Sequence, residues 1–313
     1  GILMRPDQTR ALLALTFALV ILLPGMAAAQ DRLVDVLSFL LTNDSVPTDD
    51  FVRDAEAARV TRETITRSVQ VELATLPVSS AAPGFVYRLN RELGTVERAS
   101  DSFGPFFSER SLTSGKGQAS FGLSFRAAGF THLDGTDLRD GRFVTSGNIF
   151  RGDQQPFDLQ TLTLKLSART LTGYATVGVT DRLDIGAAVP LVSISLTGTR
   201  VNTYYGDTLL RADSEARATG LGDIAVRAKY RLIEGTGAGG LAAVTELRLP
   251  TGDADNLLGA GSAAFGAFVV GSTEAGRLGA HVNGGFVVGG LSNELQYRGA
   301  ASFTPVPRVT FVG

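Results

Sequence analysis

Apolar and polar residues alternate with a period of two from Gly117 onward. Around Phe121–Phe125 the odd-numbered residues are apolar, and the even-numbered ones are small or polar. The same alternation recurs over residues 161–169, 223–232, 241–249 and 278–286. Because successive side chains of a strand point to opposite faces, each stretch predicts a β-strand with one apolar and one polar face.

The connections between these strands alternate in length. Short turns are predicted at 180–182, 234–239, 272–276 and 305–307, and long polar connections at 132–156 and 201–219, with a shorter one at 251–259. Outer-membrane barrels have short periplasmic turns and long outer loops. We therefore predict an all-β protein, an antiparallel transmembrane outer-membrane β-barrel. Pro190 and a change of parity between Ala168 and Ala175 predict β-bulges or bends.

Charged side chains recur on the polar face, where burial away from water would be costly. In a water-filled lumen they can pair and stay hydrated. The alternative is a soluble secreted β-sandwich that exposes the same face to solvent. The residues predicted to line the lumen are Arg126, Lys165, Asp223, Arg227, Lys229, Arg231, Glu246, Arg248, His281 and Asn283.

The first 110 residues follow other patterns. Residues 1–29 have two arginines, an apolar run and Ala27–Ala29, as in a cleaved signal peptide. Residues 30–110 predict a helical and hairpin segment, with helices over 31–41 and 51–73 and a hairpin over 85–98. This segment is either a plug in the lumen or a periplasmic extension.

Residues 111–313 hold the predicted barrel strands, which number eight, plus the start of a ninth at Arg308–Val312. Single-chain bacterial barrels have an even number of strands and no free edge. We therefore expect the barrel to be incomplete, that is, truncated at its C-terminus.

Composition narrows the chemistry of the 313-residue chain. It has no cysteine and only two histidines, which disfavours disulfides and thiolate or histidine metal sites, and its net charge of -2 disfavours a nucleic-acid partner. Gly235, Gly237 and Gly240 lie between two strands with no helix after them, so they predict a turn and no dinucleotide site. Asp253 and Asp255 beside Asn256 fit a solvated loop better than a calcium site. We expect no catalytic residue, metal or cofactor, and a monomer whose partners are membrane lipid and a small solute.

Four stretches together resemble the outer-membrane transporter family assigned to the phenol-degradation meta-pathway. They are Ser102–Gly117, Gly178–Val192, Gly220–Leu232 and Leu247–Gly261. The resemblance implies a monomeric barrel in the outer membrane of a Gram-negative bacterium, with passage of small, often hydrophobic compounds.

The sequence therefore predicts an outer-membrane channel or transporter for small compounds, hydrophobic or aromatic ones included. One alternative is a barrel with a structural or surface-binding role and no transport. An outer-membrane enzyme that uses His281 with a serine is disfavoured, because the sequence has no G-x-S-x-G nucleophile elbow.

Overall fold

The computed structural model describes most of the chain after residue 108 and short pieces before it. The described residues are 31–41, 59–60, 63–64, 66–67, 87–90, 95–98, 109–133, 136–141, 143–147, 159–204, 207–235, 239–306 and 309–313. The predicted signal peptide, residues 1–29, lies outside them. No helix among these residues has both the length and the apolar character needed to cross a membrane.

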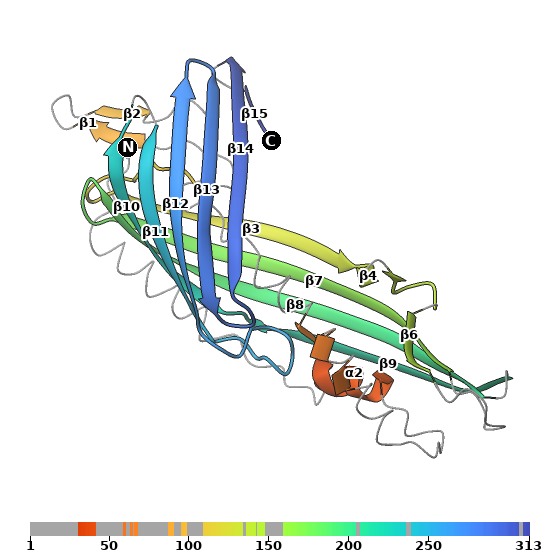
Figure 1. The fold of residues 1–313 in the computed structure, drawn as a ribbon. Helices are drawn as coiled ribbons and strands as arrows, with labels where there is room; N and C mark the ends of the chain where they lie inside the picture. Colours follow the sequence, from red (N-terminus) through yellow and green to blue (C-terminus); the bar gives the residue numbers. More distant parts are fainter. Residues whose placement is uncertain are drawn as a thin grey trace. The chain divides into compact units, whose positions relative to one another are not determined.

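One antiparallel sheet of 11 strands makes up most of the described structure (Figure 1). It curls as a half-barrel whose end strands are β3 and β15, so the prediction of an antiparallel all-β fold is confirmed. Along the sheet the order is β15 (Val309–Val312), β14 (Glu294–Val306), β13 (Leu278–Gly289), β12 (Ala264–Ala275), β11 (Gly240–Leu249), β10 (Ile224–Glu234), β8 (Leu183–Tyr204), β7 (Leu159–Gly178) and β3 (Ala119–Phe130). In addition, β6 (Phe143–Gly147) pairs with β7, and β9 (Asp207–Leu221) pairs with β8.

The apolar residues of β7 change face halfway along the strand. Leu162, Leu164 and Leu166 are buried on the even-numbered face, whereas further along Leu171 and Val177 are exposed on the odd-numbered face. The register with β8 continues without a shift from Leu159 to Gly178, so of the two alternatives predicted between Ala168 and Ala175, a bulge or a bend, the bulge is wrong. The apolar residues move from even-numbered to odd-numbered positions because the buried face of the strand becomes polar further along, while the strand itself stays regular.

The strand β8 shows the same reversal in mirror order. Ile185 and Val189 are exposed on its outer face, and beyond them Ile194 and Leu196 are fully buried on its inner face. We call β3, residues 171–178 and 183–191, and β10–β14, whose apolar residues point outward, the barrel section. We call residues 160–170, 192–202 and 211–218, whose apolar residues point inward, the extension.

Pro190 lies between the two parts of β8 without a bulge in the pairing with β7. On its other side, β8 pairs with β10 up to Ala188 and with β9 from Leu191 onward. The carbonyl of Pro190 accepts a hydrogen bond from Gly222 N at 2.9 Å, so its missing N–H faces the junction between β9 and β10. A proline is tolerated there because the strand ladder is already interrupted.

The helix α2 (Leu33–Leu41) covers the inner face of the extension and confirms the helix predicted over 31–41. Its apolar residues recur at helical spacing, and they join β7, β8 and the loop after β11 in one core. The fully buried members of this core are Leu33, Leu37, Leu40, Leu162, Leu164, Ile194, Leu196 and Leu257.

The loop between β11 and β12 holds the start of α2. Asn256 Oδ1 accepts a hydrogen bond from Leu33 N at 3.2 Å, and the carbonyl of Asp255 accepts one from Val34 N at 3.1 Å. These bonds satisfy backbone donors that the first turn of a helix leaves open. Arg32 adds an ion pair with Asp255 at 2.7 Å, so this loop is a docking surface for the helix.

The charged segment 201–219 was predicted as a long connection, and this prediction is wrong. Its described residues form the end of β8 and nearly all of β9, and these two strands pair along their length, with Leu191 opposite Leu221 and Tyr204 opposite Asp207. The outer residues of β9 are charged and its inner ones small, because its outer face meets water while its inner face lies in the extension. Arg211 and Thr199 donate hydrogen bonds to Asp213 there and lower the pKa of its carboxyl group.

The predicted hairpin over 85–98 is confirmed as β1 (Tyr87–Asn90) paired with β2 (Thr95–Arg98). The six described residues between 59 and 67 are helical, in agreement with the helix predicted over 51–73, the rest of which lies outside the described residues. Arg67 donates a hydrogen bond to the carbonyl of Leu291 at 2.6 Å, between β13 and β14. A further short hairpin pairs β4 (His132–Leu133) with β5 (Thr136–Asp137).

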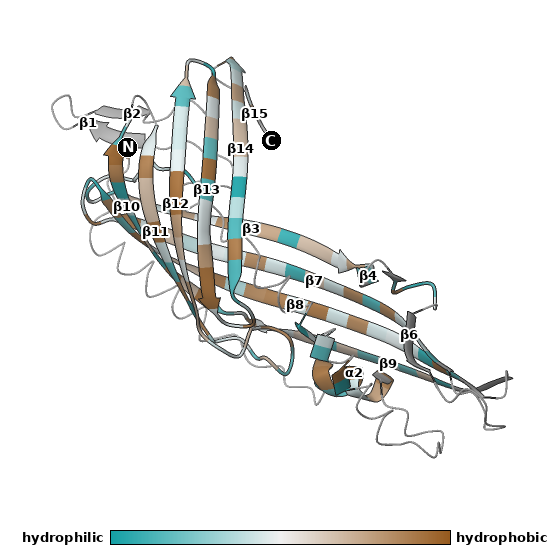
Figure 2. Cartoon of the chain, in the orientation of Figure 1, coloured by the Kyte–Doolittle hydropathy of each residue, from teal (hydrophilic) through white to brown (hydrophobic). Residues whose placement is uncertain are grey.

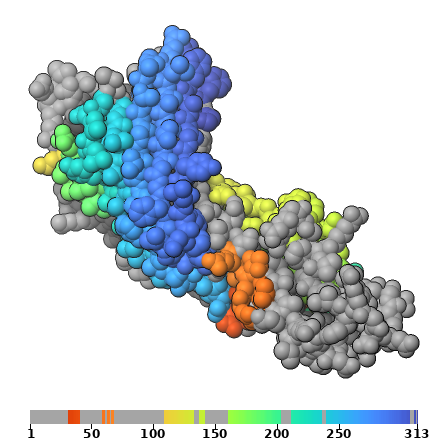
Figure 3. All heavy atoms as spheres, in the orientation of Figure 1, coloured from red at the N-terminus to blue at the C-terminus, as the bar shows by residue number. Residues whose placement is uncertain are grey.

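The outer face of the barrel section is apolar. Phe121 is 86% exposed, Leu295 83% and Tyr297 85%. Figure 2 shows the alternating brown and teal bands along these strands, and Figure 3 shows β11–β14, in cyan to blue, as one continuous surface. The outer face of the barrel section is thus apolar, whereas the outer face of β9 is charged.

We expect Leu37→Ala to loosen α2 without disturbing the barrel section. Truncating this fully buried leucine should lower the local unfolding free energy of the helix by about 2–5 kcal/mol. Hydrogen exchange of the amides of Leu33–Leu41 should accelerate accordingly. Leu295→Ala removes the same atoms from an 83% exposed position and should leave that exchange unchanged. Equal protection of α2 in both variants would contradict this account of the core.

Candidate functional site

The inner face of the barrel section carries a cluster of charged residues built by strand register. Arg227 of β10 lies directly opposite Glu246 of β11, and Asn283 of β13 lies opposite Arg298 of β14. Residues directly opposite each other on one face have their Cβ atoms about 5 Å apart, within reach of long side chains. The alternation that points Val226 and Leu247 outward therefore brings these polar groups together inside.

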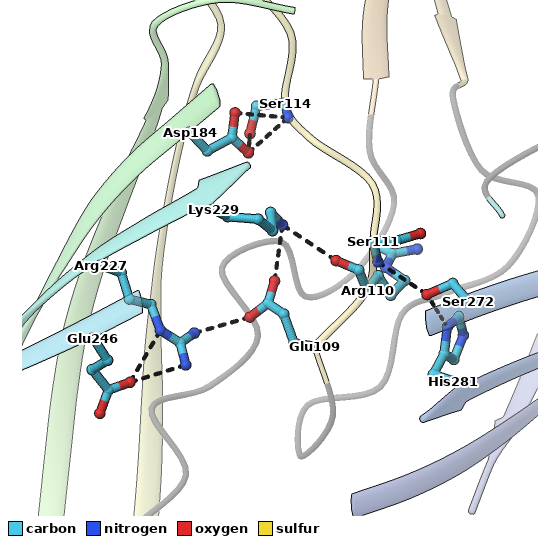
Figure 4. Close-up of polar contacts among 10 residues, drawn as sticks. All are labelled: Glu109, Arg110, Ser111, Ser114, Asp184, Arg227, Lys229, Glu246, Ser272 and His281. Atoms are coloured by element: carbon cyan, nitrogen blue, oxygen red, sulfur yellow. Dashed lines mark hydrogen bonds and ion pairs between the residues drawn. The ribbon is translucent and has the colours of Figure 1, made fainter. Parts of the chain in front are cut away.

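The segment Glu109–Ser114 enters this cluster although it belongs to no strand. All six of its residues are buried, and Arg110, Ser111 and Thr113 are 0% exposed. Figure 4 shows the segment running between two groups of side chains, with Arg227 and Glu246 on one side and the Ser272–His281 pair on the other. We call it the lumen segment.

Glu109 is the charged contact between the lumen segment and the sheet (Figure 4). Its Oε2 accepts a hydrogen bond from Arg227 Nη1 at 2.9 Å, and its Oε1 accepts one from Lys229 Nζ at 2.9 Å. Lys229 Nζ also donates to the carbonyl of Arg110 at 3.4 Å. The side chains of Glu109 and Lys229 are only 6% and 3% exposed, so burying either charge without a partner would cost free energy. In the ion pair, each charge compensates the other.

Glu246 is the second carboxylate of the cluster and binds two arginines. Its Oε2 lies 3.0 Å from Arg227 Nη2, and its Oε1 accepts a hydrogen bond from Arg248 Nε at 2.7 Å. Arg227 is therefore shared between Glu246, which is on the sheet, and Glu109, which is on the lumen segment. Movement of the lumen segment would leave Lys229 without that carboxylate.

Two further contacts hold the far end of the lumen segment. Ser114 N donates to Asp184 Oδ2 at 2.9 Å, and Thr113 Oγ1 donates to the carbonyl of Asp181 at 2.8 Å in the turn before β8. On the other side, Ser111 N donates to Ser272 Oγ at 2.9 Å. These bonds satisfy backbone donors that lie outside any sheet, so the segment has a defined path.

A pocket opens beside Glu109, between β10, β11, β12, β13 and β14. The empty space at this place, counted together with the solvent that it opens to, is about 440 Å³. One wall is apolar, and the rest is formed by guanidinium, carboxylate and amide groups. The lining residues are Glu109, Arg227, Val244, Glu246, Arg248, Phe268, Val270, Asn283, Gln296, Tyr297 and Arg298.

Most of the residues predicted to line the lumen share the inner face of the sheet. Arg227, Lys229, Arg231, Glu246, Arg248, His281 and Asn283 come together there, and Arg126 lies on the corresponding face of β3. Lys165 lies on the exposed outer face of the extension, opposite the buried Leu164.

Asp223 lies apart from the charged cluster, at the junction between β9 and β10. It accepts hydrogen bonds from Gly252 N at 2.9 Å and from Ala260 N at 2.7 Å. Asp223 therefore holds the two ends of the loop that docks α2. Its carboxylate stabilises the loop by accepting hydrogen bonds from it.

Sequence reasoning did not single out Glu109, Asp184, Gln296 or Arg298. Gln296 and Arg298 alternate with Leu295 and Tyr297, so the alternation of polar and apolar residues could have placed them on the polar face. Glu109 has no such signal, because its segment has no regular secondary structure. Only contact with β10 identifies it.

His281 pairs with a serine on the inner face. Its Nδ1 lies 3.0 Å from Ser272 Oγ, and its Nε2 has no hydrogen-bond partner within the described part of the chain. No group of three or more potential metal ligands occurs among the described residues.

Comparison with known proteins identifies the family. The model of the family described as "Putative MetA-pathway of phenol degradation" matches residues 134–306, more than half of the chain. The chain therefore belongs to this family, in agreement with the resemblance noted from the sequence. The family suggests a role related to the handling of aromatic compounds. No curated protein matches the sequence.

We expect Glu246→Gln to destabilise the protein strongly. The substitution removes the negative charge that Arg227 and Arg248 share, on a side chain that is 5% exposed, and Arg227 keeps only its ion pair with Glu109. Breaking a buried ion pair from one side costs about 3–5 kcal/mol. The free energy of unfolding in urea measures this loss. Glu215→Gln, on the exposed outer face of β9, is the matched control and should behave as an ordinary surface substitution. A similar loss in both variants would argue against the buried network.

Proposed function

We propose that the protein is a channel in the outer membrane of a Gram-negative bacterium and passes small compounds, aromatic ones among them. The observation that carries this proposal is the polarity of the barrel section. Its outer face is apolar and exposed, and its inner face is charged and buried. Such a sheet suits lipid outside and a polar lumen inside.

The outer face supports the membrane location. Soluble monomers rarely expose large contiguous apolar patches, yet Phe121, Leu123 and Phe125 project from β3, and Leu295 and Tyr297 from β14. The strands β10–β14 have 10 to 13 residues, and a tilted strand needs about 9–11 residues to cross a bilayer. The charged outer face of β9 fits a part of the sheet that projects beyond the lipid.

The inner face disfavours the soluble β-sandwich. A sandwich buries apolar residues between two sheets. Here the buried face of β10 carries Lys229 and Arg231, and that of β13 carries His281 and Asn283. These residues need water or partners of opposite charge, and a lumen offers both.

Passage through the barrel section requires the lumen segment to move. Glu109 holds this segment by two ion pairs, with Arg227 and Lys229, and these contacts support a channel that stays closed until the segment moves. The substrate class follows from the family, whose description points to phenol degradation. We propose passage without chemical conversion, so no residue is assigned a catalytic role.

A barrel with a structural or surface-binding role, without transport, is the second candidate. The extension favours it, because α2 and the loop at 251–261 pack there in a hydrophobic core of their own, separate from the charged inner face, and such a part needs a role other than passage of a solute. Conductance distinguishes the two candidates.

Cell fractionation tests the location. We expect the full-length reading frame that contains this half-barrel in the outer-membrane fraction. Its band should migrate faster on gels when the sample is not boiled, because strands that close into a barrel resist unfolding by detergent. Recovery as a soluble periplasmic protein with unchanged mobility would refute the membrane location and revive the sandwich.

Planar-bilayer recording tests transport. We expect Glu109→Gln to raise the open probability at least about tenfold, because it weakens two buried charge-assisted hydrogen bonds that contribute about 1.5–3 kcal/mol each. Glu215→Gln should gate like the unaltered protein. Absence of current from the unaltered protein and from Glu109→Gln alike would favour the non-transporting barrel.

A further inference from the structure

The pocket beside Glu109 has more positive than negative groups. Arg227, Arg248 and Arg298 line it together with two carboxylates, Glu109 and Glu246. Arg227 and Arg248 are paired with these carboxylates. One positive charge is therefore left over within the pocket.

Arg298 supplies that charge. Its Nη2 donates a hydrogen bond to Gln296 Oε1 at 3.1 Å, and Gln296 in turn donates to Glu294. Arg298 makes no ion pair among the described residues. Glu246 and Glu109 interact with Arg298 electrostatically but not within ion-pair distance. A planar guanidinium that faces a pocket in this way is well suited to bind the carboxylate of a ligand.

An aromatic ring lies on the apolar wall of the same pocket. Phe268 of β12 packs with Val244 and Val270. Glycine makes room for its ring, because a Cβ atom at Gly266 or at Gly285 would overlap the Phe268 side chain. This wall gives the apolar part of a ligand a flat surface for stacking.

Glu109 shows where a carboxylate can bind in this cluster. Its two oxygens are held by Arg227 and Lys229, yet it belongs to the lumen segment and to none of the strands. A carboxylate from outside could take the same position if the segment moved.

We propose that this pocket binds small aromatic monocarboxylates, and that their carboxylate competes with Glu109 for Arg227 and Lys229. Arg298 attracts the incoming anion, and the ring of the ligand stacks on Phe268. Binding then displaces Glu109 and releases the lumen segment. The volume of about 440 Å³ includes open solvent, so full entry of a ring requires this displacement.

The inference deepens the proposed function and rests on it for the role of the lumen segment, but binding is measured separately from transport. Isothermal titration calorimetry of the full chain in detergent micelles uses three probes at pH 7. Benzoate has both a ring and a charge, acetate has only the charge, and benzyl alcohol has only the ring. We expect benzoate to bind at least about tenfold more tightly than either of the others, because only benzoate uses both walls of the pocket.

Variants assign the binding to named residues. Arg298→Gln should weaken benzoate binding about tenfold, since it removes a charge-assisted contact. Glu109→Gln should tighten it several-fold, because it removes the internal competitor. Arg169→Gln is the matched control, since Arg169 is exposed on the opposite face of β7 and its loss should change nothing.

The unboiled band on a gel shows whether each variant is folded. If Arg298→Gln loses that band, Arg298→Lys keeps the charge but loses the planar fork, and it should still weaken binding. Equal binding of benzoate and benzyl alcohol, or unchanged binding in a folded Arg298 variant, would overturn the site. Weaker or unchanged binding in Glu109→Gln would overturn the competition. Benzoate binding without any conductance would instead contradict the channel and leave the site standing.

Discussion

The geometry of an uninterrupted strand assigns every residue to one of two faces, and the rest of this structure depends on that constraint. In β7 and β8 the apolar residues change face while the register stays continuous. The same sheet therefore has two sections with opposite polarity. In one the apolar residues point outward, and in the other they point inward beneath α2. Because twenty residues of β7 are about twice what a membrane-spanning strand needs, both sections fit on one strand.

Successive side chains of a strand point to opposite faces, so the residue after each outward apolar residue points inward. In the barrel section many of these inward residues are charged. Charges placed there need partners, and the sheet supplies only some of them. Glu246 compensates Arg227 and Arg248 from the neighbouring strand or the same one, while Lys229 takes its partner, Glu109, from a segment that is not part of the sheet. The lumen segment thus completes the electrostatics of the barrel section and occupies its interior. On the proposed function, the same contact would also keep the channel closed.

Membership of the phenol-degradation family and the arrangement of the sheet point to related roles. The family suggests the handling of aromatic compounds, and the inner face offers guanidinium groups next to an aromatic wall. A ligand that has both a ring and a negative charge would use both features. On this proposal the ligand opens the channel with a carboxylate, the same group with which Glu109 closes it. Opening is therefore selective for molecules that carry this group.

The sequence by itself determined the strands and the faces of their residues, because a period of two is a local property. It placed Arg227, Lys229, Glu246, Arg248, His281 and Asn283 on one polar face and found the helix over 31–41. It misread the hairpin of β8 and β9 as a loop, because small inner residues give weak alternation. Only the tertiary structure decided which groups meet. Glu109 lies 118 residues from Arg227 along the chain, and Arg32 lies 223 residues from Asp255. Contacts over such separations leave no periodic trace in the sequence, since they depend on how the sheet curls and on which segment its inner face accepts.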